Sequence, residues 1–320
     1  MIDPKSLARK LKSEKNAALF CHLRPDGDSI GSASALAAAL EKCGVFCDVY
    51  CDDPIPEKFL FIERVKRIRR DFPKDNSGYS ALIAIDSADI SRLGSFAQAF
   101  SAHSNTYNID HHVSNRFYAV TNYVRDCSSN CENVAALIDA LGTETDSETA
   151  NLLLMGILTD TGNFKHKNVN PSTLYTAGKL VEKGADLNNL SYLMFSAQSR
   201  ERAALFSSVM GKIRYFLDGR TALVTIRLSD FEKSGAKQWE TEGFIDFITG
   251  IEGVEVAVCM MESETDKYKV SFRSKVTDVN LVAGVFGGGG HTLASGCMIK
   301  DEYESAVDRV VCAVKRFIVE

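Results

Sequence analysis

The first half of the chain alternates short apolar runs with segments of helical periodicity. Continuous apolar runs predict buried strands at residues 17–21, 45–50, 81–85 and 106–109. Between the first two runs, apolar residues recur every three or four positions and predict a helix: Ile30, Ala33, Ala37 and Leu40. Asp28 or Ser29 can cap the start of this helix, and Gly44 suits its end. Buried strands that alternate with helices predict a parallel α/β sheet with helices on both faces.

The second half changes from helical to strand-like patterning. Helical periodicity predicts helices around 134–138, 149–158 and 174–181, followed by a connector without the glycine and serine of a flexible linker. Strand-like runs with little helix between most of them follow at 212–216, 221–226, 254–260 and 267–272. We therefore predict a first domain over 1–190, a helical connector over 191–212 and a smaller α+β domain over 213–320.

Length and composition agree with two folded domains. The chain has 320 residues and a mass of 35.1 kDa, about twice the usual size of one domain. Apolar residues make up 45% and charged residues 25%, which argues against disorder. No apolar run approaches the roughly 18 residues of a membrane span, and the first residues lack the apolar segment of a secretory signal. We expect a cytoplasmic protein with no membrane partner.

The net charge of the chain limits the classes of nucleic acid that it is expected to bind. A net charge of -5 and a pI near 5.8 disfavour a dedicated binder of long duplex DNA, which usually presents a basic face. The same charge permits a small phosphate substrate, because a bound metal ion can supply the local positive charge.

The nine cysteines are odd in number and scattered, which favours reduced thiols over a disulfide framework. Cys43, Cys47 and Cys51 lie four residues apart, but Gly44 is expected to end the helix between them. We therefore interpret them as small buried side chains and not as a zinc site.

Three predicted strands run directly into a histidine or an aspartate. His22 follows the first run, Asp86 the third and Asp110 the fourth. In open α/β sheets, ligands bind beyond the carboxyl ends of the strands, so these residues are expected to converge on one crevice. Each feature alone has a simpler explanation, because strands often end at aspartate.

Four segments combine these residues with further imidazoles and carboxylates. The turn HLRPDGDS at 22–29 holds one histidine and two aspartates, which repel each other unless a cation intervenes, although an Asp-rich turn with a helix cap is the alternative. Two histidines follow Asp110, and an apolar helix ends at Asp160. Together they supply two nitrogen and four carboxylate ligands: His22, Asp26, Asp28, Asp86, His111 and Asp160.

Six such groups can hold two divalent ions if one carboxylate bridges. Mixed imidazole and carboxylate ligation suits Mn²⁺ better than Mg²⁺, with iron and zinc as alternatives. Two ions roughly 3.5–4 Å apart clamp a phosphoryl group and activate a water for in-line attack. The pattern therefore predicts a two-metal phosphoryl hydrolase.

The glycine-rich stretch before His291 is a second candidate site. Gly287, Gly288, Gly289 and Gly290 leave backbone N–H groups unhindered, which can cradle an anion, especially at a helix N-terminus. A flexible hinge is the alternative. A P-loop is excluded, because no Gly-Lys-Ser/Thr follows.

The combination and order of these segments resemble a known family. HLRPDGDS (22–29), IAIDSAD (83–89), NIDHHVSN (108–115) and GILTDTGNF (156–164) resemble the four motifs of the DHH phosphoesterases. SFRS (271–274) and GGGGH (287–291) resemble the DHHA1 domain that accompanies them. Size and domain pairing are similar to those of the family's short-oligoribonucleotide hydrolases, which also act on pAp, and not to the longer RecJ exonucleases.

The resemblance implies a role for each residue. His22 and Asp26 would hold one metal ion, Asp28, His111 and Asp160 the other, and Asp86 would bridge them. His112 would stabilise charge at the scissile phosphate, with Asp110 behind it. In the C-terminal domain, Arg273 and His291 would grip a terminal phosphate or the nucleotide, beside the backbone of Gly288, Gly289 and Gly290.

We therefore expect an enzyme that uses two divalent ions, most simply Mn²⁺, to hydrolyse short oligoribonucleotides of two to five nucleotides to mononucleotides. Dephosphorylation of pAp is a second expected activity, and the family makes a homodimer plausible. The alternatives are hydrolysis of linear dinucleotides such as pApA or pGpG, a cyclic-dinucleotide phosphodiesterase, and a nucleotide-binding sensor without catalysis. A pyrophosphatase shares the N-terminal motifs but pairs them with a domain lacking GGGGH.

Overall fold

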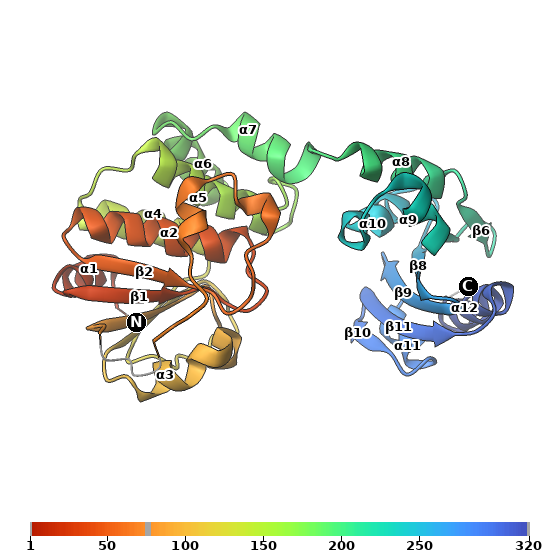
Figure 1. Cartoon of the computed structure of the whole chain (residues 1–320), viewed down its shortest axis with the longest axis horizontal. Coiled ribbons are helices and arrows are strands. Elements are labelled where there is room, and N and C mark those ends of the chain that lie inside the picture. The colour runs from red at the N-terminus through yellow and green to blue at the C-terminus, as the bar shows by residue number, and fades with distance from the viewer. Residues whose placement is uncertain (1, 74–77, 319–320) are drawn as a thin grey trace. The chain divides into compact units, whose positions relative to one another are not determined.

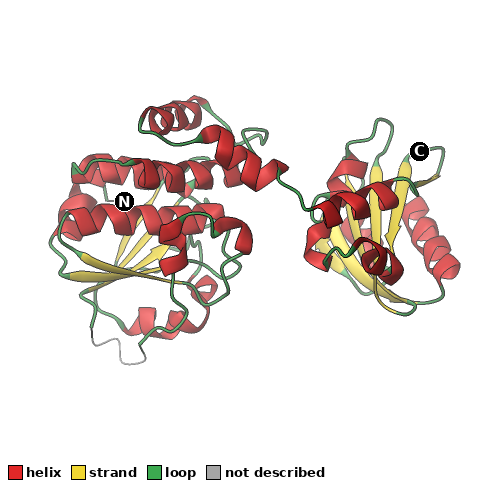
Figure 2. Ribbon diagram, turned by 45° about the horizontal axis from the view of Figure 1, so that its top comes forward, coloured by secondary structure: helices red, strands yellow, loops and turns green. Residues whose placement is uncertain are grey.

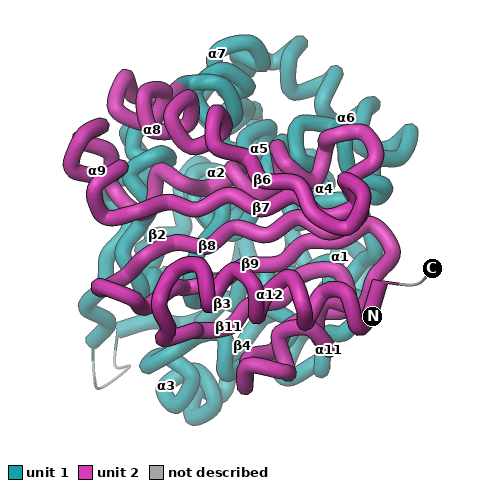
Figure 3. Tube along the Cα trace, turned by 90° about the vertical axis from the view of Figure 1, so that its right-hand side faces the viewer, with its two compact units in different colours: residues 1–197 teal, residues 198–320 magenta. Residues whose placement is uncertain are grey.

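The computed structural model describes residues 2–73 and 78–318 and consists of two compact units, Met1–Ala197 and Gln198–Glu320 (Figure 3). The division falls inside the segment predicted as a helical connector. That segment is not one helix: α7 (Leu187–Ser191) continues into a π-helical turn (Tyr192–Ser196), and α8 (Arg200–Met210) begins only after an extended Ala197. Ser199 caps α8 by accepting a hydrogen bond from the backbone N–H of Arg202.

The first unit is built on a five-stranded sheet in which every neighbouring pair is parallel, as predicted. The strand order is β2-β1-β3-β4-β5. The strands are β1 (Asn16–Phe20), β2 (Phe46–Tyr50), β3 (Ala81–Ile85), β4 (Thr106–Asp110) and β5 (Thr121–Val124). The order places β1, β3 and β4 side by side, so the residues that follow them emerge at the same edge.

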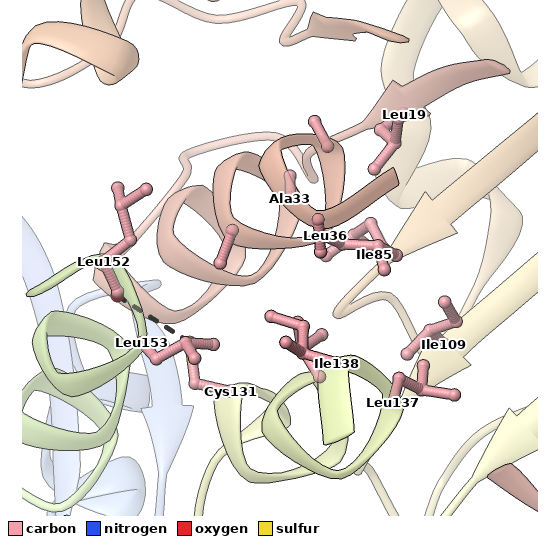
Figure 4. Close-up of a cluster of buried hydrophobic side chains, with 14 of the residues drawn as sticks. Leu19, Ala33, Leu36, Ile85, Ile109, Cys131, Leu137, Ile138, Leu152 and Leu153 are labelled. Carbon is pink, nitrogen blue, oxygen red and sulfur yellow. Dashed lines mark hydrogen bonds between the residues drawn. The ribbon is translucent and has the colours of Figure 1, made fainter. Parts of the chain in front are cut away.

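Helices cover both faces of this sheet (Figures 1 and 2). One face carries α1 (Pro4–Lys12), α2 (Gly27–Lys42), α4 (Asn130–Leu141) and α5 (Ser147–Asp160), with α6 (Pro171–Glu182) packed outside α4 and α5. The other face carries the 3₁₀ segment η3 (Ile90–Phe96) and α3 (Ala97–Ala102), which cover an aromatic cluster. Figure 4 shows the larger core, where side chains of α2, α4 and α5 meet the ends of β1, β3 and β4. The α/β prediction is confirmed.

Helix α2 begins slightly earlier than the sequence suggested. Its N-terminal cap is Asp26, not Asp28 or Ser29 as predicted. Asp26 has an extended backbone, and its Oδ1 accepts hydrogen bonds from the backbone N–H groups of Asp28 and Ser29 at 3.1 and 3.0 Å. Asp28 is thereby free to turn its carboxylate inward. Gly44 follows the helix with φ +85°, a conformation that suits glycine.

The second unit contains a six-stranded mixed sheet in the order β10-β11-β9-β8-β7-β6. The strands are β6 (Arg214–Phe216), β7 (Thr221–Ile226), β8 (Val256–Glu264), β9 (Lys267–Ser274), β10 (Gly289–His291) and β11 (Ala294–Lys300). Only β7 and β8 pair in parallel, joined through α9 (Leu228–Ser234) and α10 (Phe244–Thr249). Helices α11 (Val279–Gly284) and α12 (Tyr303–Phe317) cover one face, and α8 and α10 pack on the β7–β8 side of the other.

All nine cysteines lie in the described part of the chain and are free thiols. Within residues 2–73 and 78–318, no helix has the length and apolar character needed to cross a bilayer.

Candidate metal centre

The carboxyl ends of β1, β3 and β4 bring three predicted ligands together. His22, Asp86 and His111 follow these neighbouring strands directly or after one residue. Asp86 adopts φ +55°, and its backbone N–H bonds to the carbonyl of Ile109 at 2.9 Å. This left-handed turn at the end of a strand aims the Asp86 carboxylate between the two imidazoles.

Two groups of candidate ligands share Asp86. In the first, Nε2 of His22 lies 3.6 Å from Oδ2 of Asp26 and 3.4 Å from Oδ2 of Asp86. In the second, Nε2 of His111 lies 3.3 Å from Oδ1 of Asp86 and 3.4 Å from Oδ2 of Asp160. Asp86 therefore presents one carboxylate oxygen to each group, which is the arrangement that a bridging ligand requires.

Asp28 completes the second group from inside the protein. Its Oδ2 lies 3.8 Å from Nε2 of His111, and its side chain is fully buried. The start of α4 holds it there: Ser129 Oγ donates to Oδ1 at 2.6 Å, and the N–H groups of Asn130 and Cys131 donate at 2.6 and 2.9 Å. A helix N-terminus stabilises negative charge, so Asp28 can stay buried as a carboxylate near a cation.

Helix α5 delivers Asp160 because it approaches α2 closely at a glycine. A Cβ atom on Gly156 would stand 2.3 Å from Sγ of Cys131 and 2.8 Å from Oδ1 of Asp28. No larger residue fits there without displacing one of these groups. Gly156 therefore sets the spacing that lets Asp160, one turn further along α5, reach His111.

Replacing Gly156 by Ala is expected to lower the free energy of unfolding by about 1–3 kcal/mol, because the added methyl group overpacks a buried contact. It should also weaken Mn²⁺ binding, since Asp28 must shift. Thermal unfolding and manganese titration measure the two effects. Gly178→Ala is the matched control: Gly178 is an exposed residue of α6, and a methyl group added there would have nothing within 4 Å. An unchanged Gly156→Ala protein would contradict the packing argument.

His112 and Asp110 form a pair beside the ligand groups. Nδ1 of His112 lies 2.7 Å from Oδ1 of Asp110, whose other oxygen accepts a hydrogen bond from Asn115 at 2.5 Å. The hydrogen bond to Asp110 raises the pKa of His112. Because Asp110 takes Nδ1 and the ring is 43% exposed, Nε2 is the nitrogen left to donate to a ligand.

The charges of the centre are unbalanced without a cation. Burial and the neighbouring carboxylates of Asp28 and Asp86 raise the pKa of Asp160 to about 10. Burial opposes the charged form of His22 and His111, but the close carboxylates outweigh it, those of Asp26 and Asp86 for His22 and those of Asp86 and Asp28 for His111, and raise the pKa values of the two histidines to about 10 and about 11. These raised pKa values favour protonated groups in the metal-free centre, and a bound metal ion would displace those protons.

The residues fit a pair of divalent ions. The ligand atoms lie within 4.8 Å of one another in each of three sets: His22, Asp26 and Asp86; Asp28, His111 and Asp160; and Asp86, His111 and His112. Oδ1 of Asp86 is buried and makes no hydrogen bond within the described part of the chain. A buried carboxylate oxygen normally has a partner; Nε2 of His111 lies 3.3 Å away without forming a hydrogen bond, so both atoms are available to a cation between them. Imidazole with carboxylate is a donor set typical of manganese, zinc or iron.

The predicted substrate-binding residues lie in the second unit. Arg273 of β9 and His291 of β10 both pair with Ala294 of β11, so they occupy one row of the sheet and the same face. The structure does not place the glycine run at a helix N-terminus, because Gly289 and Gly290 form the edge strand β10 after the end of α11.

Close packing explains part of this glycine run. A Cβ atom on Gly288 would stand 2.2 Å from the carbonyl oxygen of Gly296, so no side chain fits. The N–H of Gly290 donates to Asn280 Oδ1 at 2.9 Å and is not available to an anion in this arrangement. The glycine run therefore offers fewer free backbone N–H groups to an anion than the sequence suggested.

Sequence reasoning missed residues that support the centre. Ser129, which holds Asp28, carried a signal in the Ser-x-x-Glu pattern of a helix start. Arg92, whose Nη2 lies 2.8 Å from Nδ1 of His22, carried none, because it belongs to the 3₁₀ segment η3, 70 residues from His22 in sequence.

Comparison with known proteins agrees with this geometry. Residues 16–157 match the DHH family, N-terminal domain, and residues 221–320 match the DHHA1 domain. A bifunctional oligoribonuclease and PAP phosphatase NrnA of Thermus thermophilus is 35% identical over 92% of this chain and 87% of its own length.

Two solved structures share the fold. An exopolyphosphatase-related protein from Bacteroides fragilis superposes with a TM-score of 0.82 at 23% identity, covering 98% of this chain and 95% of that one. RecJ from Thermus thermophilus, solved in complex with Mn²⁺, gives a TM-score of 0.54 at 14% identity and covers 98% of this chain and 54% of its own. From the two matched domains and the identity to a relative along almost its whole length, the chain belongs to the DHH/DHHA1 family.

Proposed function

We propose that this protein is a metal-dependent phosphodiesterase that hydrolyses short oligoribonucleotides to mononucleotides and also dephosphorylates pAp. The observation that carries the proposal is Asp86, which turns one carboxylate oxygen toward each of two ligand groups. The relative from Thermus thermophilus bears both activities in its name and supports this choice of substrates.

In this proposal His22 and Asp26 would hold one divalent ion, Asp28, His111 and Asp160 would hold the other, and Asp86 would bind both. Two ions held in this way would lower the pKa of a water nucleophile and neutralise charge on the phosphoryl group. Mn²⁺ is the favoured ion because of the donor set, and the RecJ structure with manganese supports it.

His112 acts on the phosphoryl group in this proposal. Oδ1 of Asp110 lies 2.7 Å from Nδ1 and accepts its proton, which fixes the ring and leaves Nε2–H to donate to a substrate. The raised pKa of His112 favours the imidazolium, which donates a charge-assisted hydrogen bond to a phosphoryl oxygen. This bond strengthens as negative charge develops in the transition state.

Arg273 and His291 bind the nucleotide in the same proposal. Nη1 of Arg273 donates to the neighbouring carbonyl of Phe272 at 3.1 Å, and Nε lies 3.9 Å from a carboxylate oxygen of Asp246. These contacts leave most of the planar fork open to a phosphate. Short substrates suit an acidic chain with one small cationic grip.

The test is hydrolysis of a labelled RNA ladder from two to twenty-four nucleotides, with pAp alongside, in the presence of Mn²⁺. We expect mononucleotide release to be fastest from the shortest strands, with turnover of pAp. Arg273→Ala should raise KM about tenfold or more, because a charge-assisted contact is lost. Activity confined to linear or cyclic dinucleotides would replace the proposed substrate, and tight nucleotide binding without turnover would favour a sensor.

A further inference from the structure

One arginine lies directly against the candidate metal centre. Arg92, in η3, places Nη2 2.8 Å from Nδ1 of His22, and its side chain is half-buried. Within residues 2–73 and 78–318, no carboxylate lies within ion-pairing distance of it. The guanidinium of Arg92 and a metal ion bound by His22 would both be positively charged. Two neighbouring cations repel each other unless an anion lies between them.

The local backbone holds Arg92 in this position. The carbonyl of Arg92 accepts the N–H of Leu23 at 2.7 Å, which ties η3 to the turn that follows β1. Two residues later, Gly94 has φ +62°, and a Cβ atom there would stand 2.3 Å from Oδ2 of Asp52. Asp52 also accepts the N–H and the hydroxyl of Ser95, at 2.7 and 2.9 Å. The placement is therefore determined by several contacts and not by one flexible side chain.

The acidic residues of the neighbouring segments are already engaged. Asp89 forms an ion pair with Arg116 at 3.0 Å, and Asp53 accepts the N–H of Arg24 at 2.7 Å. Asp26 and Asp86 face Nε2 of His22, on the opposite side of the ring from the atom that Arg92 touches. None of these carboxylates neutralises the guanidinium.

Arg92 cannot bond to Nδ1 of His22 whenever that nitrogen carries a proton, as it does in an imidazolium or in a ring whose Nε2 holds a metal ion. Nδ1 of His22 lies 2.8 Å from the carbonyl oxygen of Leu23 and 2.8 Å from Nη2 of Arg92. The nitrogen either donates to the carbonyl or accepts from the guanidinium, but it cannot do both. If Nε2 bound a metal ion, the ring proton would be on Nδ1, which would donate it in a hydrogen bond to the carbonyl oxygen of Leu23. The guanidinium then lacks an acceptor next to the loaded centre.

We propose that Arg92 binds a phosphate group of the nucleotide substrate at the His22 side of the metal centre. The inference rests on the proposed function for the identity of the substrate. The group that Arg92 would bind is a phosphate, whichever nucleotide carries it. The planar fork of arginine bonds two phosphoryl oxygens at once, which lysine does not match. Arg92 would thereby fix which substrate phosphate enters the centre, through a contact separate from those of Arg273.

The experiment compares Arg92→Ala and Arg92→Lys with Arg9→Ala, which removes an exposed charge of α1 bonded only to Ser6 in the described structure. Manganese affinity is measured first by calorimetry. Affinities for inorganic phosphate and for AMP are then measured on the manganese-saturated proteins. KM and kcat are measured with the two-nucleotide RNA as substrate. We expect Arg92→Ala to weaken phosphate and AMP binding and to raise KM, each by about tenfold or more, with a smaller effect for Arg92→Lys.

The same measurements separate this proposal from a positioning role. If Arg92 only orients His22, its removal weakens manganese binding and leaves phosphate affinity unchanged at saturating manganese, which would overturn the proposal. If Arg92 binds phosphate, manganese affinity is kept or increases, because a nearby positive charge has gone. A native protein that binds phosphate but hydrolyses no oligonucleotide would count against the proposed function alone. The phosphate affinities of the native protein and its Arg92 variants would still test the role of Arg92.

Discussion

Asp86→Asn is expected to abolish manganese-dependent turnover, with a loss of about a thousandfold or more. Among the described residues, Asp86 is the one side chain within 3.4 Å of the imidazole Nε2 atoms of both His22 and His111. An amide lacks the negative charge and offers one oxygen in place of two, so it cannot join two ions. The loss of several kcal/mol of transition-state stabilisation corresponds to this rate effect.

This substitution should leave the fold in place. Asp86 has φ +55°, and asparagine tolerates the left-handed conformation better than most residues. The volume of the side chain is also nearly unchanged, so loss of activity can be attributed to the charge and not to packing.

Three measurements check the result: turnover of the dinucleotide in Mn²⁺, the number of manganese ions bound per chain, and the temperature of unfolding. We expect two ions per native chain and fewer in the variant, with the metal-free proteins unfolding at similar temperatures. Asp139→Asn is the control, because Asp139 is exposed on α4, away from the ligand groups. Near-native activity of Asp86→Asn in Mn²⁺ would rule out the bridging role.

The part of the centre that lies at strand ends was predictable from sequence. His22, Asp86 and His111 follow apolar runs whose parallel pairing the alternation with helices already indicated. Since neighbouring parallel strands end at the same edge, their residues had to converge. Asp160 was predicted from a different signal, an apolar helix that ends at an aspartate, and the structure shows that it approaches His111 from that helix.

The supporting residues were not predictable because they depend on how the elements pack. In the sequence, Gly156 is an ordinary residue of a predicted helix. Only the packing of α5 against Asp28 shows that a methyl group has no room at this position. Arg92 reaches His22 across 70 residues of sequence through a loop shaped at Gly94. The glycine run at 287–290 has a role that the sequence did not suggest: beside the predicted anion cradle and its alternative, a flexible hinge, the structure uses these glycines in strand pairing and close contacts.

These supporting residues also show how buried charge is organised in the first unit. The N-terminus of α4 faces Asp28, and imidazoles face every other candidate carboxylate ligand. The protein thus surrounds the four carboxylates with partial and titratable positive charge, and a bound cation would replace the titratable part of it. Metal binding should therefore be linked to proton release.

Manganese affinity is expected to rise steeply between pH 6 and pH 9. Without metal, His22, His111 and Asp160 have pKa values of about 10, 11 and 10, so each binds a proton at neutral pH. A ligand must lose its proton to bind the ion, so binding releases up to about three protons and affinity increases with pH while these groups remain protonated. Each released proton contributes about a tenfold rise in affinity per pH unit. Calorimetry in buffers of different ionisation enthalpy counts the protons, and Asp160→Asn should release one fewer. An affinity independent of pH, with no dependence on the buffer, would show that the ligands are already deprotonated in the metal-free protein.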